Sequence, residues 1–377
     1  MHRIHAGESE EAELGLHFDL TVPLARYVAQ YYNDLTFPFR RYQIQKVWRG
    51  ERPQAGRARE FVQADVDIVA DGELPISADV EVIAVIHSVF REIGFSAYTM
   101  RINNRKILRG FLAFLDIPEN LVGETIRLID KIDKIGISKI EQELQTLLGS
   151  EATVSSILEY LKLRTLSNRD KLEYLEAVDH PEVRTGVTEL REVYEGVLAL
   201  GVDEARLVLD PAIARGLDYY TGTILETFVD GHESLGSIAS GGRYEDLASN
   251  FINRKLPGVG ASIGQTRLFY ILRELGYVKI TTKTPSIFFV SRFDDTPADA
   301  AYVILSRIRA AGIAAEGVLD AGQKIGKQIA HADKKGISYV VMAGADELAK
   351  NIIQIKKLSS AESREFPLDS NPSDWIF

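Results

Sequence analysis

The chain has 377 residues, of which 45% are hydrophobic and 26% charged, a composition typical of a folded globular protein with two or three domains. It contains no cysteine, which excludes disulfides, thiolate metal sites and cysteine nucleophiles, and no run approaches the roughly 18 apolar residues of a membrane span. The net charge of −10 argues against a protein coated in nucleic acid but allows a local basic patch. The N-terminus lacks the apolar segment of a signal peptide, so we expect a cytoplasmic protein that binds no membrane.

The first 110 residues mix strand and helix patterns. Residues 62–70 read VQADVDIVA, in which polar and apolar side chains alternate as on a half-buried strand. Residues 78–93 carry apolar residues at helical spacing, and Gly94 follows where a helix C-terminus favours glycine. These patterns predict an α+β domain that begins within residues 1–110.

From residue 111 to residue 196 the sequence becomes charged and helix-periodic. The apolar face of the last predicted helix is formed by Val183, Val187, Leu190, Tyr194 and Val197. Gly201 follows this face as a C-terminal cap. Strand-like sequence with many glycines then returns, so we predict a helical insertion over residues 111–196 in a domain that resumes over residues 197–282.

A short polar stretch, TTKTP at residues 281–285, marks the boundary of the last predicted domain, residues 283–377. Here strands predicted in SIFFV, IAAEGVL and ISYVVMAG alternate with helices. The first helix is predicted to have Thr296 as its N-cap and to end at Gly312, and the second to end near Gly336. The alternation predicts a small, mostly parallel α/β domain.

Sequence motifs for common cofactor sites do not match. GVGASIG has its last glycine one position late for a dinucleotide fingerprint, and GQKIGKQ lacks the loop length and hydroxyl residue of a P-loop. The histidines are scattered, and a metal ion would have to bind through oxygen or imidazole. We therefore expect no metal site built from protein side chains alone.

One segment is unusually rich in arginine. Residues 48–68 place Arg49, Arg52, Arg57 and Arg59 ahead of a strand whose Gln63, Asp65 and Asp67 share one face. Guanidinium groups suit phosphate oxygens because they bind them in pairs and keep their charge. Taken alone, the segment is equally consistent with a solvated loop beside a half-exposed strand. SGGRYEDL could likewise be a hairpin turn, and the glycines of GVGASIG could allow close helix packing.

Six segments in order resemble the histidyl-tRNA synthetases, a family of class II aminoacyl-tRNA synthetases. They are FDLTVPLARY, WRGERPQAGRAREFVQADVDI, INNRKIL, ARGLDYYTG, SGGRYEDL and GVGASIGQTRL. ARGLDYYTG and SGGRY resemble the two signatures of the histidine-specific branch, and WRGE and GQTR resemble motifs 2 and 3 of the whole class. The resemblance covers nearly the whole chain from about Leu14. It implies an antiparallel sheet core with flanking helices, a helical insertion and a C-terminal α/β anticodon-binding domain.

The resemblance implies that the chain activates histidine with ATP and transfers it to tRNA(His). In the first step a carboxylate attacks the α-phosphate, so fixed positive charges must bring two anions together. By resemblance, Arg49 bridges the carboxylate and the phosphate, and Arg215 reaches the same phosphate from the other side. Phe61 and Arg267 would sandwich the adenine. The residues implied to bind ATP are Arg49, Glu51, Arg57, Phe61 and Arg267. Mg²⁺ would bridge phosphate oxygens without a protein cage.

Histidine recognition requires both an acceptor and a donor, because neutral imidazole offers one of each. The residues implied to bind histidine are Asp19, Thr21, Gln63, Asp67, Tyr220 and Tyr244. Asp67 and Tyr220 would meet the ring nitrogens and Tyr244 would close the pocket, while the other three hold the amino and carboxylate ends. Many bacterial members have glutamate where this chain has aspartate at positions 19 and 67, a subgroup difference.

For tRNA, the resemblance implies that Arg52 and Gln54 meet the acceptor end. Lys324, Lys327 and Gln328 are candidate backbone contacts in the C-terminal domain, although two lysines on a helix are usually a solvated face. The family normally carries several dozen residues ahead of FDLTVP, including motif 1, which builds the dimer interface. This sequence does not contain that segment. Either the chain is truncated or the segment belongs to the intact protein. We expect the second, because the remainder is intact, and we expect a homodimer.

Two alternatives belong to other functional classes. The synthetase-like regulatory subunit of ATP phosphoribosyltransferase shares this fold and binds histidine without charging tRNA, but such paralogues tend to lose the catalytic arginines and the anticodon-binding domain. This chain retains Arg49, Arg215 and Arg267 and has the C-terminal domain. A class II synthetase of another specificity would not explain ARGLDYYTG. The combination of motifs therefore favours histidine activation.

Overall fold

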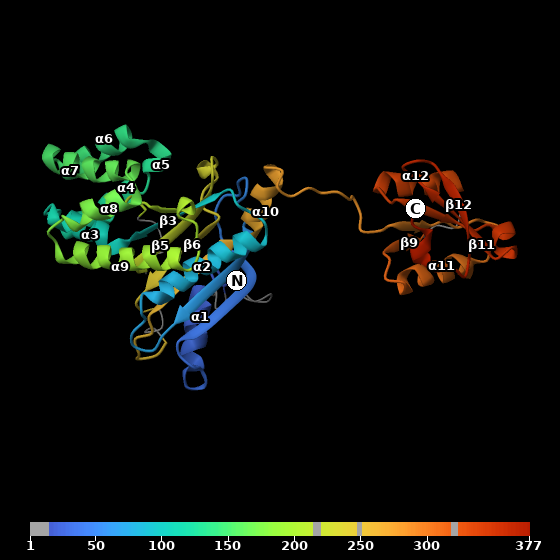
Figure 1. Cartoon of the computed structure of the whole chain (residues 1–377), viewed down its shortest axis with the longest axis horizontal. Helices are drawn as coiled ribbons and strands as arrows, with labels where there is room; N and C mark the ends of the chain where they lie inside the picture. Colours follow the sequence, from blue (N-terminus) through green and yellow to red (C-terminus); the bar gives the residue numbers. More distant parts are fainter. Residues whose placement is uncertain (1–14, 214–219, 247–250, 318–322) are drawn as a thin grey trace, which may run out of the picture. The chain divides into compact units, whose positions relative to one another are not determined.

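The computed structural model describes residues 15–213, 220–246, 251–317 and 323–377. The chain divides into two compact units, Met1–Val278 and Lys279–Phe377 (Figure 1), and each unit has its own hydrophobic core. Among the helices in these ranges, none is long and apolar enough to cross a membrane. The two units are described separately below.

A seven-stranded sheet with the order β1-β2-β7-β6-β5-β3-β4 organises the first unit. Its strands are β1 (Phe39–Trp48), β2 (Glu60–Val69), β3 (Tyr98–Asn104), β4 (Leu207–Leu209), β5 (Tyr220–Val229), β6 (Ala239–Tyr244) and β7 (Gly258–Gly264). Every neighbouring pair is antiparallel except β3 and β4. The predicted α+β class with an antiparallel sheet core is confirmed.

Strand β2 carries the polar face that the sequence predicts. Gln63, Asp65 and Asp67 lie on one side of the strand, while Ala64 and Val66 pack against the hydrophobic core on the other. All three polar residues are buried, so the alternative of a half-exposed strand beside a solvated loop is wrong for this strand. Polar side chains in the interior need partners, which makes this face a candidate binding surface.

Two long helices pack on one another beside the sheet. Helix α2 (Ser77–Glu92) and helix α9 (Pro181–Ala199) match the predicted helices, and Gly94 has the expected positive φ of 73°. A Cβ at Gly196 of α9 would lie 2.8 Å from Val80 of α2, so this glycine permits the close approach. Helix α1 (Thr21–Gln30) and helix α10 (Gln265–Glu274) complete the elements around the polar face.

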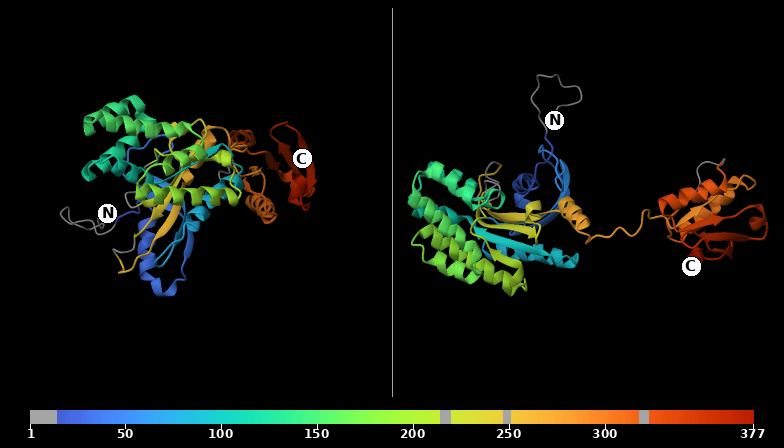
Figure 2. Two further views of the ribbon diagram at one scale, coloured as in Figure 1. Left: turned by 60° about the vertical axis from the view of Figure 1, so that its left-hand side comes forward. Right: turned by 90° about the horizontal axis from the view of Figure 1, so that it is seen from above.

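The segment between β3 and β4 contains helices and no strand among its described residues. Ahead of α9 it consists of α3 (Arg105–Phe114), α4 (Glu119–Ile129), α5 (Ile132–Ile135), α6 (Ile137–Leu148), α7 (Glu151–Lys162), the 3₁₀ helix η2 (Leu163–Thr165) and α8 (Asn168–Glu176). Figures 1 and 2 show these green helices at one end of the sheet, away from the blue β1–β2 hairpin. Their apolar side chains, such as Ile140 and Tyr160, belong to the same continuous core as the sheet.

The second unit contains a five-stranded sheet of order β12-β11-β10-β8-β9. Its strands are β8 (Phe288–Val290), β9 (Ala315–Gly317), β10 (Tyr339–Met342), β11 (Ile352–Lys357) and β12 (Ser363–Pro367). Strand β8 is parallel to β9 and β10, whereas β10, β11 and β12 are antiparallel. The sheet is therefore mixed, and the prediction of a mostly parallel sheet missed its last two strands.

Three helices accompany this sheet: α11 (Ala298–Ala310), α12 (Ile325–Lys335) and α13 (Ala345–Ala349). Helix α12 ends at Gly336 as predicted, with a positive φ of 78°. Helix α11 has Pro297 as its N-cap rather than the predicted Thr296, because the Thr296 hydroxyl instead donates to the Phe293 carbonyl at 2.9 Å.

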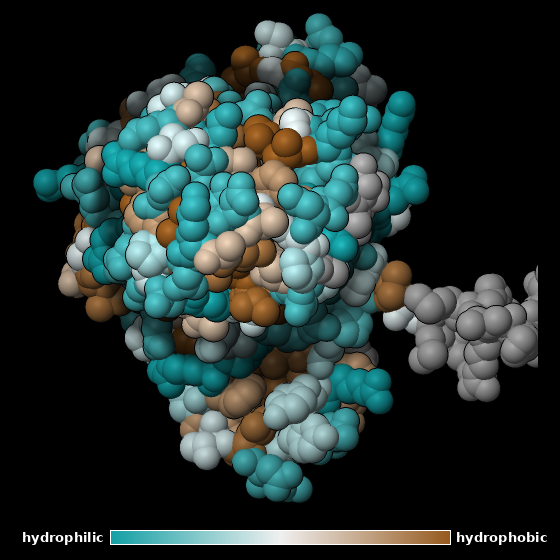
Figure 3. All heavy atoms as spheres, turned by 90° about the vertical axis from the view of Figure 1, so that its right-hand side faces the viewer, coloured by the Kyte–Doolittle hydropathy of each residue, from teal (hydrophilic) through white to brown (hydrophobic). Residues whose placement is uncertain are grey.

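The face drawn in Figure 3 is mostly hydrophilic, with its hydrophobic residues in small separate patches, as is usual for a protein surface.

Candidate functional site

Two neighbouring cavities of about 240 and 220 Å³ lie over the polar face of the first sheet. The first is lined by β2, β5, β6 and β7 and by the start of α1. The second is lined by the β1–β2 loop, β2, β6, β7 and the start of α10. Arg49, Gln63, Ser240 and Ser262 line both cavities. The two spaces therefore share four lining residues and adjoin one another.

The first cavity collects the predicted histidine-binding residues. Its lining includes Asp19, Thr21, Gln63, Asp67, Tyr220 and Tyr244. Tyr220 and Tyr244 come from adjacent strands, where they lie directly opposite one another. Asp65 and Glu226 add two further carboxylates to the lining. This excess of carboxylates favours a ligand that carries positive charge or several N–H donors.

Asp67 is held at the floor of this cavity by two side chains. Arg41 Nη2 lies 2.8 Å from Asp67 Oδ2, and Tyr244 Oη donates to Asp67 Oδ1 at 3.4 Å. The sequence analysis missed Arg41, although the hairpin places it directly opposite Asp67 in the β1–β2 register. Facing residues of an antiparallel pair have neighbouring side chains, so this register was the signal that could have identified it.

The buried carboxylates of the first cavity have perturbed acidities. Burial raises the pKa of Asp65 to about 6 and that of Asp67 to about 7, despite the nearby Arg41 charge. Within the described residues, Asp65 Oδ1 and Gln63 Oε1 are buried and have no hydrogen-bond partner. Leaving such acceptors unpaired costs free energy, which a ligand with N–H groups would recover. Asp65 thus lines this cavity, although the sequence analysis gave it no role.

Glycines of β6 and β7 make room for the side chains of the first cavity. A Cβ at Gly260 would overlap Asp67 Oδ1, and one at Gly258 would overlap the Tyr244 ring. The segment GVGASIG is strand β7, so the alternative that its glycines serve close helix packing is wrong. They instead allow Asp67 and Tyr244 to lie flat against a neighbouring strand.

The second cavity collects the predicted ATP-binding residues. Its lining includes Arg49, Glu51, Arg57, Phe61 and Arg267. Arg267 donates to the Ser237 carbonyl at 2.8 Å and to the Leu235 carbonyl, which fixes its guanidinium at the cavity wall. Burial, followed by the charge of Arg57, lowers the pKa of Arg267 to about 10, so it remains charged at neutral pH.

Arg49 stands where the two cavities join. Its Nε donates to the Phe18 carbonyl at 3.3 Å. Its guanidinium carbon lies 4.5 Å from the centre of the Phe18 ring and 5.2 Å from that of the Phe61 ring. These contacts hold a positive charge between two aromatic faces. A fixed cation at the shared wall can attract anionic groups from both sides.

The predicted tRNA-contacting residues lie in the β1–β2 loop outside both cavities. Arg52 and Gln54 are exposed, and the backbones of Gln54 and Arg57 exchange hydrogen bonds of 3.0 and 2.8 Å across a tight turn. Gly56 takes a positive φ of 69° inside this turn. The turn therefore presents Arg52 and Gln54 to solvent, while Arg57 lines the second cavity.

Of the remaining residues, one predicted site residue is not described and two polar residues have structural partners. Arg215 lies outside the described residues. Arg243 of SGGRYEDL is buried, pairs with Asp79 and donates to the Leu74 carbonyl at 2.8 Å, so it stabilises the fold and lines neither cavity. Gln328 was a candidate tRNA contact, but it is fully buried and bonded to the backbone of Arg292, so that suggestion is wrong.

Comparisons with known proteins agree with this arrangement. The family model described as histidyl-tRNA synthetase matches residues 4–268, and that described as anticodon binding domain matches residues 287–373. A histidine–tRNA ligase of Xanthomonas axonopodis pv. citri (strain 306) is 46% identical over 357 residues, which cover 92% of this chain and 74% of the relative. The crystal structure of histidyl-tRNA synthetase from Nostoc sp. PCC 7120 has 39% identity and a TM-score of 0.79, over 95% of this chain and 82% of that one. An ATP phosphoribosyltransferase regulatory subunit/histidyl-tRNA synthetase from Bacillus halodurans C has 22% identity and a TM-score of 0.65, over 84% and 77% of the two chains, and this likeness concerns the fold alone.

Proposed function

The chain belongs to the histidyl-tRNA synthetase family, and we propose that it activates histidine with ATP to histidyl-adenylate and then transfers the histidyl group to tRNA(His). The observation that carries this proposal is the pair of adjoining cavities, one rich in carboxylates and one rich in arginines, with Arg49 at their shared wall. A histidine-binding regulatory subunit would have no use for the arginine-lined second cavity. That alternative is not favoured.

In the first reaction step, the histidine carboxylate attacks the α-phosphorus of ATP, a mixed anhydride forms and pyrophosphate leaves. The carboxylate is already ionised, so the protein needs no general base. Arg49 reduces the repulsion between the two anions and stabilises the charge that builds on the phosphoryl oxygens. Arg215 is assigned the same phosphate from the resemblance of its signature.

In the first cavity, Asp67 and Tyr220 bind the two imidazole nitrogens and Tyr244 closes the pocket. The ion pair with Arg41 fixes the orientation of Asp67 before histidine arrives. Asp19, Thr21 and Gln63 hold the amino and carboxylate ends. The unpaired Asp65 Oδ1 lies among these groups and accepts a further ligand N–H.

In the second cavity, Phe61 and Arg267 hold the adenine, with Glu51 and Arg57 along the nucleotide. A Mg²⁺ ion bound with the triphosphate would neutralise part of its charge. Among the described residues, no group of three or more His, Asp or Glu side chains is arranged so that it could hold a metal ion. Glu51 and Glu226, which line the second and first cavities, are the carboxylates that could hold it.

The pKa values of Asp65 and Asp67 predict a pH dependence. Protonation of either carboxyl removes an acceptor for histidine, so we expect kcat/KM for histidine to fall as the pH decreases through about 7 and then 6. Histidine itself titrates in this range, so the test uses a ratio. At each pH, kcat/KM of the native protein is divided by that of Asp65→Asn, which cancels the effect of the titration of histidine. A ratio that does not change with pH would contradict the role of Asp65.

Without ligand, the stability of the protein depends on pH in the opposite direction to kcat/KM. Both folded-state pKa values lie above the unfolded value near 3.8. The contribution of these two groups to the free energy of unfolding is therefore greatest below that value and is lost as the pH rises through about 6 to 7.

We assign tRNA binding to the second unit, which matches the anticodon-binding domain model. Ending the chain after Thr284, ahead of β8, is expected to leave histidine-dependent pyrophosphate exchange nearly unchanged and to cripple charging of tRNA(His). Both cavities and their core lie in the first unit, so adenylate formation needs none of the deleted residues. The test compares pyrophosphate exchange with tRNA charging for both chains. Unchanged kcat/KM for tRNA in the shortened chain, or lost exchange in a folded one, would contradict the assignment.

We also assign the protein to the cytoplasm, where ATP and tRNA are available, and to a homodimer. An apolar hollow of about 500 Å³ between the β1–β2 hairpin and α2 supports the dimer, since Tyr42 and Ile44 there are 81% and 61% exposed. Contact between two copies at this hollow would remove these side chains from water. Sedimentation at twice the monomer mass is expected, and a monomer over the micromolar range would contradict it.

The experiment that tests the proposed activity is pyrophosphate exchange with each of the twenty amino acids in turn. Histidine alone is expected to support exchange, and charging of tRNA(His) should follow when the tRNA is added. Exchange with a different amino acid would assign another specificity. Histidine binding without any exchange would favour the regulatory alternative.

A further inference from the structure

Asp65 lies in the middle of the polar face of β2, between Gln63 and Asp67. All three residues line the first cavity, and Gln63 lines the second cavity as well. Successive side chains on one face of a strand are about 6.6 Å apart. The face therefore extends from Asp67 in the first cavity, past Asp65, to the place at Gln63 where the two cavities adjoin.

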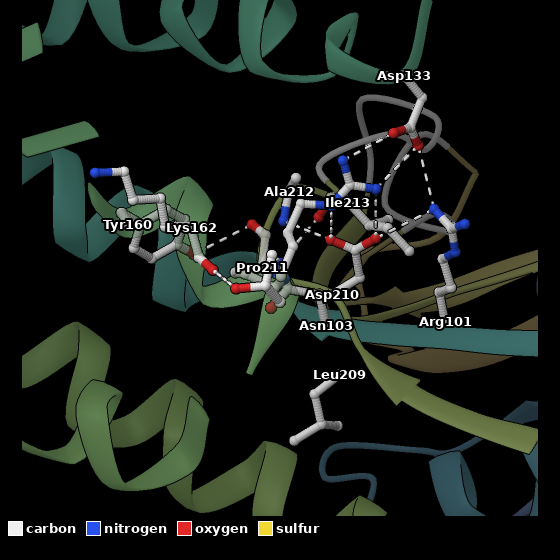
Figure 4. Close-up of polar contacts among 12 residues, drawn as sticks. Arg101, Asn103, Asp133, Tyr160, Lys162, Leu209, Asp210, Pro211, Ala212 and Ile213 are labelled. Atoms are coloured by element: carbon white, nitrogen blue, oxygen red, sulfur yellow. Dashed lines mark hydrogen bonds and ion pairs between the residues drawn. The ribbon is translucent and has the colours of Figure 1, made fainter. Parts of the chain in front are cut away.

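Asp65 differs from the other buried aspartates in its contacts. Of the five in the described ranges, Asp65 alone has a buried carboxylate oxygen, Oδ1, without a hydrogen-bond partner. Figure 4 shows the contrasting case of Asp210, both of whose oxygens accept hydrogen bonds. Arg164 donates to them at 3.0 and 3.1 Å, and it also binds both oxygens of Asp133. Buried carboxylates normally have such partners, so the open acceptor of Asp65 indicates a site that a ligand completes.

A serine of β7 fixes the side chains of Gln63 and Asp65. Gln63 Nε2 donates to Ser262 Oγ at 2.5 Å. Burial raises the pKa of Asp65, and a hydrogen bond from Ser262, which faces it in the β2–β7 register, partly offsets this rise. The hydroxyl has one proton, so it accepts from Gln63 and donates to Asp65. This order leaves two acceptors for a ligand, Gln63 Oε1 and Asp65 Oδ1, both unpaired among the described residues.

The charges around Asp65 favour a cation that carries an anion beside it. After burial, the negative charge of Asp19 also raises the pKa of Asp65, whereas Arg41 and Arg49 lower it. Arg41 is already paired with Asp67, at 2.8 Å. A positive ligand group between Asp19 and Asp65 would relieve their repulsion. An anionic group on the same ligand would then face Arg49.

We propose that Asp65 and Gln63 bind the α-ammonium group of histidine, and that Ser262 positions both side chains for it. This inference rests on the proposed function, in which the first cavity binds histidine. Histidine has its ring at one end and its ammonium and carboxylate groups on one carbon at the other. With the ring at Asp67, the ammonium reaches Asp65 and gives its N–H donors to the two unpaired acceptors. Asp65 thereby selects histidine over imidazole compounds that lack an α-ammonium group.

The proposal predicts opposite effects of Asp65→Asn on stability and on binding. Without ligand the ionised carboxylate is buried with an unpaired oxygen, which is destabilising, and asparagine has the same shape without the charge. The urea midpoint of the unliganded protein should therefore rise, while histidine affinity should fall about 10- to 100-fold with the lost charge-assisted hydrogen bond. A residue that served the fold would show the reverse, a lower midpoint with unchanged affinity, and this result would overturn the proposal.

Two histidine analogues test the proposed contact itself. Histidinol keeps the ring and the ammonium group but lacks the carboxylate, and imidazolepropionate keeps the ring and the carboxylate but lacks the ammonium group. Isothermal titration, at a pH well above the Asp65 pKa of about 6, measures both dissociation constants without the reaction. Asp65→Asn should weaken the binding of histidinol about 10- to 100-fold and should not weaken that of imidazolepropionate.

Ser262→Ala tests the positioning role. This variant keeps the Asp65 charge but leaves the Gln63 amide free to turn, so we expect histidinol to bind about 3- to 10-fold more weakly and imidazolepropionate to bind as before. If Asp65→Asn loses its cooperative thermal transition, Ser262→Ala decides the outcome. Glu60→Gln is the matched control, because it neutralises a half-exposed carboxylate of the same strand that pairs with Lys46 at 2.7 Å. It should alter neither dissociation constant.

The analogues also separate this inference from the proposed function. Equal weakening of both analogues in Asp65→Asn would place Asp65 against the ring and overturn the α-ammonium site. Unchanged histidinol binding in the folded variant would overturn it as well, and both results would leave the proposed activity intact. A native protein that binds neither histidine nor histidinol would instead contradict the proposed function, and with it the basis of this inference.

Discussion

Replacing Arg49 with alanine is expected to lower kcat for histidine-dependent pyrophosphate exchange about 10²- to 10³-fold. Arg49 lines both cavities, and the Phe18 carbonyl and the Phe18 and Phe61 rings hold its guanidinium in place. It is therefore held in place at the point where we propose that carboxylate and phosphate meet. Lysine should restore little activity, because a single ammonium cannot bind the two anions with a planar pair of donors.

Arg40→Ala is the matched control for this variant. Arg40 belongs to the same hairpin, but its guanidinium is exposed and pairs with Glu81 at 2.8 Å, a contact that contributes at most about 1 kcal/mol. Its exchange rate should equal that of the native protein. If Arg49→Ala kept more than a tenth of the native kcat, the meeting point of the two substrates would have to lie elsewhere.

Replacing Asp67 with alanine is expected to raise the KM for histidine about 10- to 100-fold while changing that for ATP little. This change removes the carboxylate that we propose as the imidazole partner, and it leaves the second cavity intact. The same change strands the Arg41 guanidinium in the interior, so the free energy of unfolding should fall by about 3–5 kcal/mol. Steady-state kinetics and urea denaturation measure the two effects separately.

The double variant Arg41→Ala with Asp67→Ala separates binding from folding. Removing both charges should restore much of the lost stability, because no buried charge is left unpaired. Histidine affinity should remain poor. Recovery of histidine affinity together with stability would mean that Asp67 serves the fold alone.

The two-residue alternation of β2 was enough to predict that Gln63, Asp65 and Asp67 share a face. Their burial could not be predicted, because it depends on β7, which pairs with β2 from about 200 residues further along the chain. The role of the glycines in GVGASIG depends on the same pairing. A glycine that makes room for Asp67 cannot be distinguished in sequence from one that lets helices pack.

The helical segment between β3 and β4 was predictable from its periodicity, whereas its connection to Asp210 was not. Asp133, Arg164 and Asp210 are 31 and 46 residues apart along the chain, and charged residues in helical sequence are usually solvated. Gln328 was misjudged because a polar residue on a helix is usually exposed. Its side chain instead donates to the backbone carbonyls of Arg292 and Gln323. Strands β11 and β12 were missed because they lie in short, charged stretches.

The most direct test of the central claim is a crystal structure of the protein with histidinol and ATP, a pair that cannot react because histidinol lacks the carboxylate. We expect the imidazole to lie between Asp67 and Tyr220 in the first cavity, the adenine between Phe61 and Arg267 in the second, and the α-phosphate against Arg49. An imidazole bound away from Asp67, or a nucleotide whose α-phosphate does not reach Arg49, would contradict the account.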